Sequence, residues 1–248
     1  MNRPLILISN DDGYDAKGIV ELVRMVRSFG DIIVCAPEEC QSGKSRAFSM
    51  GPLTLRDVRE RDGERWTACS GTPVDCIKMA CNVLCPRTPD LILGGINHGD
   101  NASVNAHYSG TVGIAFEGAM KGVPSIAFSL CDYDADADFR PMEGYVRKIC
   151  DGVLSHGLPP MTFLNVNVPK VSIASELRGM LQCRMARGEW KKEVILPAEG
   201  SREYHLKGYF ENHEPEDAST DAWAVSNGYV AVTPSTVDVT SYCDLDWL

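Results

Sequence analysis

The chain has 248 residues, 44% of them hydrophobic, and a formal net charge of −10. This length suits one large domain that carries an additional segment. The composition is typical of a globular protein with a sizeable core. The negative charge argues against a broad basic face for long nucleic acid, and no apolar run approaches the roughly 20 residues that span a bilayer. Since the N-terminus also has no signal-peptide layout, we expect a soluble cytoplasmic protein.

The first predicted element is a buried strand over residues 5–8, an apolar run that ends at the sequence SNDDG. A helix over 16–29 and a second buried strand over 31–36 complete a βαβ unit, without a GxGxxG fingerprint. Adjacent carboxylates such as Asp11 and Asp12 resist burial unless a cation neutralises them, and Mg²⁺ or Mn²⁺ prefers oxygen ligands. The alternative is an ordinary solvated turn.

A polar loop over residues 37–50 follows and contains Ser42 and Gly43. A Ser-Gly turn at this end of a sheet can offer a hydroxyl to a metal, although an ordinary loop has the same composition. Two further strands, over 53–56 and 65–69, flank the hairpin signal Asp62-Gly63. The ten cysteines form no CxxC pair, so we expect reduced thiols that pack as small hydrophobic side chains.

A helix over residues 73–84 precedes the second informative stretch, DLILGGINHGDN. Its apolar part predicts a buried strand over 91–93 that breaks at Gly94-Gly95. The polar part then presents Asn97, whose neutral oxygen can complete an acidic metal site. His98 is either a general base or a solvated loop residue.

The residues Ser109, Gly110 and Thr111 open the next predicted helix, which continues to Met120. Small residues and hydroxyls at a helix start suit an anion site, and ordinary capping is the alternative. A core strand over 125–130 follows. The acidic segment DYDADAD lacks the Gly and the terminal Glu of an EF-hand, which favours a solvated loop.

A helix over 142–154 and a strand over 162–168 end the regular alternation of strand and helix. We therefore divide the chain into an α/β catalytic core, residues 1–169, and a C-terminal extension, residues 170–248, that packs on it. In the extension, the sequence predicts strands over 182–185, 203–210 and 229–232 and a short helix over 220–225.

Several different short motifs follow one another along nearly the whole chain. They are NDDG at 10–13, SG at 42–43, GTP at 71–73, GIN at 95–97, YSGTV at 108–112, NVNVP at 165–169 and TD at 220–221. The polar turns among them follow predicted strands at one sheet edge, and together they favour a metal-assisted reaction on a phosphate. In these motifs the chain resembles the SurE survival-protein nucleotidases.

The resemblance implies a Rossmann-like, three-layer α/β fold with a mainly parallel sheet and a C-terminal β-hairpin extension that makes oligomer contacts. It implies one divalent ion per subunit, Mg²⁺ or Mn²⁺, and homodimers or homotetramers with exchanged C-terminal segments. Carried over by motif, the metal ligands are Asp11, Asp12, Ser42 and Asn97, with Asp11 and Asp12 also catalytic. The implied substrate-binding residues are Asn10, Asn101, Ser109, Gly110 and Thr111.

The expected activity is hydrolysis of nucleoside 5′-monophosphates to nucleoside and phosphate by a metal-dependent 5′-nucleotidase. Hydrolysis of 3′-monophosphates or short polyphosphate stays open, as does the choice between an Asp and a water as the attacking group. One alternative is a non-catalytic nucleotide-binding protein. The other is a phospho-receiver module, which needs an acceptor Asp where these strands end in Cys35-Ala36 and Gly94-Gly95.

Overall fold

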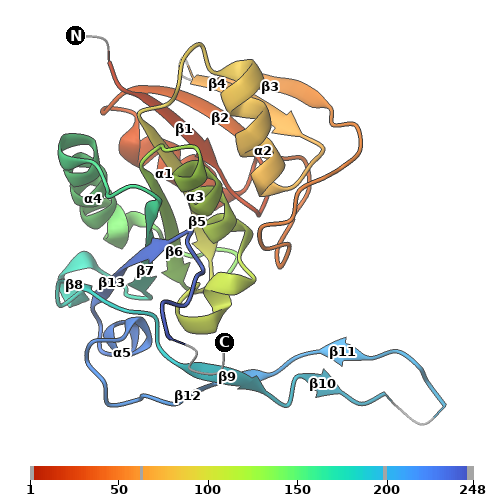
Figure 1. The fold of residues 1–248 in the computed structure, drawn as a ribbon, viewed down its shortest axis with the longest axis vertical. Helices are drawn as coiled ribbons and strands as arrows, with labels where there is room; N and C mark the ends of the chain where they lie inside the picture. The colour runs from red at the N-terminus through yellow and green to blue at the C-terminus, as the bar shows by residue number, and fades with distance from the viewer. Residues whose placement is uncertain (1–2, 62–63, 198–199, 245–248) are drawn as a thin grey trace.

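The structure, a computed structural model, describes residues 3–61, 64–197 and 200–244. Its centre is a nine-stranded sheet in the order β3-β4-β2-β1-β5-β6-β7-β13-β8 (Figure 1). The strands of this sheet are β1 Leu5–Ser9, β2 Asp31–Pro37, β3 Leu55–Arg61, β4 Glu64–Cys69, β5 Leu91–His98, β6 Ser125–Cys131, β7 Thr162–Pro169, β8 Met180–Gln182 and β13 Val230–Thr236. The α-helices are α1 Lys17–Val26, α2 Pro73–Met79, α3 Gly110–Met120, α4 Glu143–His156 and α5 Asp221–Ser226. No helix in these described ranges is both long and apolar enough to cross a membrane.

Helices cover both faces of the sheet, which makes the core three layers thick. In β1, Ile6 and Ile8 pack in a cluster with the apolar sides of α1 and α4. The alternate residues Leu5 and Leu7 pack on the opposite face in a cluster that contains residues of α2 and α3. Successive side chains of a strand point to opposite faces, so the continuous apolar run of β1 is what burial on both faces requires.

The strand order reverses on either side of β1, the strand at the middle of the parallel region. On one side of β1 lie β2 and then β4. On the other side lie β5, β6 and β7, and every pair of neighbouring strands in this series is parallel. Such a reversal is a topological switch point, where a crevice opens beyond the carboxyl ends of the strands. The turn after β1 and the end of β5 therefore lie at the expected position of a ligand site.

The chain beyond Pro169 contributes two strands to the main sheet. β13 pairs antiparallel with β7, and β8 joins the sheet by pairing in parallel with β13. Between β8 and β13 the chain forms a long two-stranded arm, described over residues 188–197 and 200–212, that projects from the core (Figure 1). The arm consists of β9 Gly188–Lys191 paired with β12 Tyr209–Asn212, and β10 Val194–Ile195 paired with β11 His205–Leu206.

The predicted α/β fold with a mainly parallel sheet and a C-terminal hairpin is confirmed, with differences in particular elements. The prediction that the strand starting at Leu91 breaks at Gly94-Gly95 is wrong, because β5 continues to His98. A Cβ on Gly94 would lie 2.7 Å from the Thr111 carbonyl oxygen, and one on Gly95 would lie 2.4 Å from the Phe128 carbonyl oxygen. These glycines allow neighbouring backbone to approach the strand closely and do not end it.

The arm differs from its prediction because two short strand pairs replace one strand over 203–210. Its partner strands β9 and β10 lie in a charged segment, GEWKKEVI, where alternation of apolar and polar residues is weak. The hairpin signal Asp62-Gly63 lies outside the described residues.

Candidate metal and phosphate site

The first carboxylate after β1, Asp11, lies in the gap between β1 and the start of α3. Its side chain is buried, and the Thr111 hydroxyl donates a hydrogen bond of 2.5 Å to its Oδ1. Gly110 packs directly on this carboxylate, because a Cβ at that position would lie 2.7 Å from Asp11 Cβ. A negative charge at the N-terminus of a helix is favoured by the free N–H groups and the helix dipole. The first turn of α3 thus holds Asp11 in place.

Burial raises the pKa of both carboxyl groups in this turn. For Asp11, desolvation is the largest cause, and hydrogen bonds from the Thr111 side chain and from nearby backbone oppose it. For Asp12, desolvation and then the neighbouring charge of Asp11 raise the pKa to about 6, against a smaller opposing effect of His98. Two ionised carboxylates in this position are costly unless a cation is bound, which is the electrostatic condition of a metal site.

The donor atoms at the site fit a hard divalent cation. Asp12 Oδ2 is buried and has no hydrogen-bond partner among the described residues. The Asn97 side-chain nitrogen donates to the carbonyl oxygens of His98 and Gly99, at 3.1 and 2.9 Å. Its Oδ1 is therefore the atom left for a ligand. Ser42, in the loop after β2, is exposed and brings a hydroxyl to the same cavity. Carboxylate, amide and hydroxyl oxygens are the ligands that Mg²⁺ and Mn²⁺ prefer.

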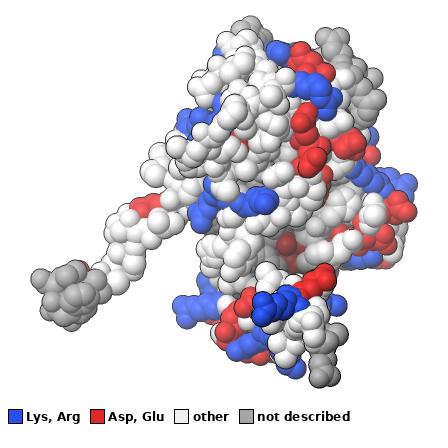
Figure 2. Space-filling view, turned by 90° about the vertical axis from the view of Figure 1, so that its right-hand side faces the viewer, with Lys and Arg blue, Asp and Glu red and all other residues white. Residues whose placement is uncertain are grey.

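A cavity of about 300 Å³ opens over these groups. Figure 2 looks at the side of the molecule toward which the arm points, and it shows a hollow between the core and the arm with acidic side chains in its depth. The residues that line the cavity are Asp11, Ser42, Gly43, Asn97, His98, Asp100, Asn101, Asn105, Tyr108, Ser109, Tyr133 and Trp190. The structure thus brings three of the four predicted metal ligands and two of the predicted substrate contacts to one cavity.

The other predicted residues are not among those that line this cavity. Asp12 and Thr111 neighbour Asp11 as described above. Asn10 is fully buried, and its side chain closes the turn by bonding both the carbonyl oxygen and the N–H of Gly13. Its predicted contact with substrate stays a prediction, because the Asn10 amide is already engaged within the turn.

The two substrate contacts that do line the cavity are held by firm local bonds. The Ser109 oxygen caps α3 by accepting the Val112 N–H at 3.1 Å, which leaves its hydroxyl hydrogen for another acceptor. The Asn101 side-chain nitrogen donates to Ser129 Oγ at 2.8 Å, so its Oδ1 is left for a ligand. The Asn101 N–H in turn donates to Asn167 Oδ1 at 2.7 Å. A polar network in the sheet therefore supports the cavity floor.

The cavity also contains aromatic and polar residues that were not predicted from the sequence to be site residues. Asp100 accepts hydrogen bonds from the Asn105 amide at 3.0 Å and from the Tyr133 hydroxyl at 2.8 Å. The Trp190 indole N–H donates to Asn105 Oδ1 at 2.9 Å, which fixes the base of the arm to the site. Trp190 and Tyr133 lie in charged segments without apolar periodicity, so no local pattern marks them.

A separate group of potential metal-ligating side chains lies on the arm. Glu189, Glu211 and His213 bring one ligand atom each within 4.8 Å of the others, and all three are exposed. Lys191 already places its ammonium group 2.5 Å from Glu189 and 3.9 Å from Glu211. We assign no ion to this group, because the Lys191 ammonium group already lies against both carboxylates.

The fold and the site define an α/β protein with an acidic, oxygen-rich cavity at the switch point of a mainly parallel sheet. The family model described as "Survival protein SurE" matches residues 6–192. The chain is 49% identical to the 5′-nucleotidase SurE of Bacteroides thetaiotaomicron, over 99% of this chain and 95% of that protein. It is also 49% identical to the 5′-nucleotidase SurE of Phocaeicola vulgatus, over 97% and 93% of the two chains.

A solved structure shows the same architecture. The crystal structure of the SurE protein from Aquifex aeolicus superimposes with a TM-score of 0.80 at 33% identity, and the match covers 96% of each chain. The chain therefore belongs to the SurE family.

Proposed function

We propose that the protein is a divalent-metal-dependent 5′-nucleotidase that hydrolyses nucleoside 5′-monophosphates to nucleoside and phosphate. The observation that carries the proposal is the Asp11–Asp12 pair beside the start of α3, in which Asp11 is buried and the buried Oδ2 of Asp12 has no hydrogen-bond partner among the described residues, in a chain of this family. The names of the two relatives at 49% identity agree with this activity. Nucleoside 3′-monophosphates and short polyphosphate are further candidate substrates for the same site.

In this proposal Asp11, Asp12, Ser42 and Asn97 hold one Mg²⁺ or Mn²⁺ per subunit. When bound, the ion supplies positive charge that offsets the charge of the phosphoryl oxygens. The hydrogen bond from Thr111 orients Asp11, and the two backbone bonds of the Asn97 amide orient its oxygen. These bonds fix the ligand set before the ion or the substrate arrives, which reduces the reorganisation that binding requires.

The rest of the cavity binds and shields the phosphate group. The Ser109 hydroxyl donates to a phosphoryl oxygen, since its own oxygen is occupied by the Val112 N–H. Gly110 and Thr111 place the positive end of α3 at the same place, which stabilises negative charge as it builds on phosphorus. The rings of Tyr108, Tyr133 and Trp190 line the cavity and limit the access of water.

The activity test is phosphate release from 5′- and 3′-nucleoside monophosphates and from short polyphosphate, with Mg²⁺, with Mn²⁺ and with EDTA. Asp11→Asn should lose more than about a hundredfold in rate, because it removes a carboxylate that both holds the ion and faces the substrate. Asp15→Asn, an exposed aspartate of the same turn, is the matched control and should keep the native rate. Release that persists in EDTA or in Asp11→Asn would contradict the proposal, and binding without release would favour a nucleotide-binding protein.

We further propose that the subunits form a homodimer or homotetramer with exchanged C-terminal segments. The arm supports this, because it projects from the core and exposes the apolar side chains Val194, Ile195, Leu196, Tyr204 and Tyr209. Apolar surface of this extent is usually covered by a partner. Light scattering on the full chain tests the subunit number, and a monomer at micromolar concentration would overturn the proposal.

A further inference from the structure

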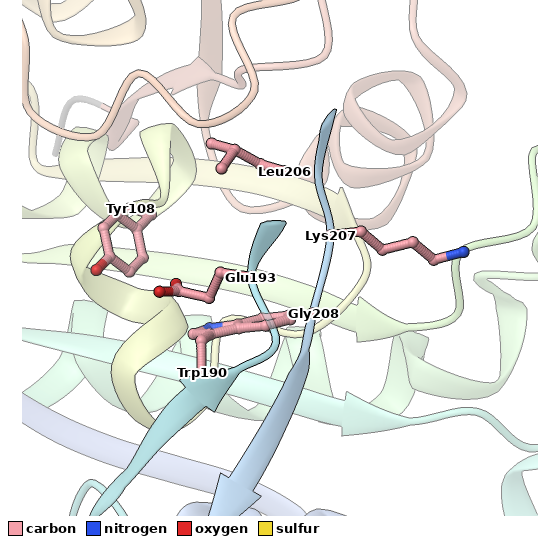
Figure 3. Close-up of a pocket in the computed structure, with 6 residues that line it drawn as sticks. All are labelled: Tyr108, Trp190, Glu193, Leu206, Lys207 and Gly208. Carbon is pink, nitrogen blue, oxygen red and sulfur yellow. The ribbon is translucent and has the colours of Figure 1, made fainter. Parts of the chain in front are cut away.

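A second cavity, of about 430 Å³, adjoins the metal and phosphate site. It is lined by Tyr108, Trp190, Glu193, Leu206, Lys207 and Gly208 (Figure 3). Tyr108 and Trp190 line both cavities, so the two cavities adjoin at these residues. A ligand with its phosphate group at Ser109 can therefore extend past the rings into the second cavity, whose volume is in the range of small-molecule sites.

Both residues are attached close to the phosphate site, Tyr108 through its backbone and Trp190 through its side chain. Tyr108 immediately precedes Ser109, the residue that caps α3, so its Cα lies one peptide unit, about 3.8 Å, from that of the capping residue. Trp190 is fixed by its hydrogen bond to Asn105, which itself bonds Asp100 in the first cavity. Flat apolar faces held in this way are surfaces on which nucleobases stack.

The second cavity also contains one unpaired acidic group. Glu193 is exposed, and its carboxylate makes no hydrogen bond or ion pair with any other residue that the structure describes. In Figure 3 the Glu193 carboxylate points toward Tyr108, whereas the Lys207 side chain points the other way, out of the group of labelled residues. The charge that faces a ligand here is therefore negative.

We propose that Tyr108, Trp190 and Glu193 form a nucleobase subsite in which Glu193 selects guanine. The inference rests on the proposed function, which places the phosphate group at Ser109. An ionised carboxylate only accepts hydrogen bonds, and it accepts two parallel bonds best. Guanine offers two adjacent N–H donors on one edge, from N1 and the exocyclic amino group. Adenine and cytosine place a ring-nitrogen acceptor beside their amino group, and uracil flanks its one N–H with two carbonyl oxygens.

The kinetic test compares kcat/KM for GMP, IMP, UMP and ribose 5-phosphate in the native chain and in Glu193→Gln. Ribose 5-phosphate has no base, so its turnover reports the phosphate site alone. We expect Glu193→Gln to lower the GMP-to-UMP ratio at least about tenfold, the usual value of one bidentate contact to a base. IMP, which lacks the amino group, should lie between GMP and UMP. Glu203→Gln, elsewhere on the arm, is the matched control and should leave all four values unchanged.

The stacking wall is tested with Trp190→Leu and Trp190→Phe. Loss of the ring in Trp190→Leu should raise KM for GMP and for UMP by a larger factor than KM for ribose 5-phosphate, and Trp190→Phe should restore most of this difference. An unaltered GMP-to-UMP ratio in Glu193→Gln, or ribose 5-phosphate hydrolysed as well as GMP by the native chain, would overturn the subsite while the phosphatase activity stands.

A binding measurement separates the subsite from the proposed function. Saturation-transfer NMR with guanosine and uridine, which carry no phosphate, needs no turnover. The subsite predicts a stronger signal for guanosine that is lost in Trp190→Leu and reduced in Glu193→Gln. If no phosphate ester is hydrolysed but this pattern is present, the proposed function fails and the subsite stands. If guanosine gives no such signal, the subsite is refuted.

Discussion

The Thr111 hydroxyl donates a 2.5 Å hydrogen bond to Asp11 Oδ1 and so joins the first turn of α3 to the end of β1. The bond links two motifs that lie far apart in the chain, at the point where the strand order of the sheet reverses. It orients a carboxylate whose pKa is raised by burial, and it opposes part of that rise. The first prediction tests this relationship.

Thr111→Val should keep the fold and lower activity. Valine has nearly the shape of threonine but no hydroxyl, so Asp11 loses the bond that orients it. Loss of such a supporting bond usually costs about 10–100-fold in metal affinity or activity. The measurements are kcat/KM with GMP and Mn²⁺ affinity by calorimetry. Thr111→Ser keeps the hydroxyl and is the control, and equal losses in both variants would show that packing, and not the bond, matters.

The Asp12 carboxyl group should make the metal-free protein less stable as the pH rises from about 4 to 6. Its pKa is about 6 in the folded chain, mainly through desolvation, against about 3.9 when unfolded. In this window the folded state holds a proton that the unfolded state has released. Its contribution to stability is therefore complete at low pH, lost on the way to pH 6, and at most of the order of 3 kcal/mol.

The measurement for Asp12 is urea unfolding in EDTA at pH 4.5 and pH 7.5 for the native chain and Asp12→Asn. Other carboxylates also titrate, so the test is the difference between the two proteins at each pH. Asp12→Asn should gain stability relative to the native chain at the higher pH, and Mn²⁺ should reverse that order. A difference that does not depend on pH would count against a buried Asp12.

Gly110→Ala should disrupt the site directly. The added Cβ would lie 2.7 Å from Asp11 Cβ and 3.0 Å from Pro73 Cγ, so either the turn after β1 or α3 must shift. We expect a loss of about 1–3 kcal/mol in unfolding free energy together with most of the activity. Gly144→Ala in α4 meets no atom within 4 Å and should instead stabilise the protein by about 0.5–1 kcal/mol. Normal activity in Gly110→Ala would mean that this packing does not constrain Asp11.

Asp221→Ala should loosen the connection between the arm and the core. The buried Asp221 carboxylate accepts the N–H groups of Ser103 and Ala186, both at 2.9 Å. Its removal leaves these buried donors unpaired, at a cost of about 2–4 kcal/mol. Asp221→Asn keeps one acceptor oxygen and should cost less. Thermal unfolding gives the stabilities, and hydrogen exchange of residues 186–190 should increase in Asp221→Ala if this bond holds the arm.

The core was predictable because its pattern is local. The run from Leu5 to Ile8 is apolar at every position, and a run this short is typical of a strand buried on both faces. The Asp11–Asp12 pair at its end was also recognisable, since parallel strands bring their carboxyl ends to one edge. What the structure adds is the orientation of each group, such as the two backbone bonds that turn the Asn97 oxygen toward the cavity.

The arm residues could not be predicted from local patterns. Trp190 reaches the site only because a hydrogen bond to Asn105 joins segments that are remote in the chain. Similarly, Gly94 and Gly95 look like a strand end in the sequence. Their function, the close approach of the Thr111 and Phe128 carbonyl groups, depends on elements that fold against the strand from elsewhere.

The position of β13 has a consequence for protein synthesis. β13 lies between β7 and β8, and among the described strands it alone pairs with β8. The ribosome therefore releases β8 before the strand that attaches it to the sheet has been made. During translation the edge of β7 stays open, and an open edge is a template for wrong pairing. A nascent chain stalled before Val230 should therefore be a strong client of chaperones, whereas one extended past Thr236 can close its own sheet.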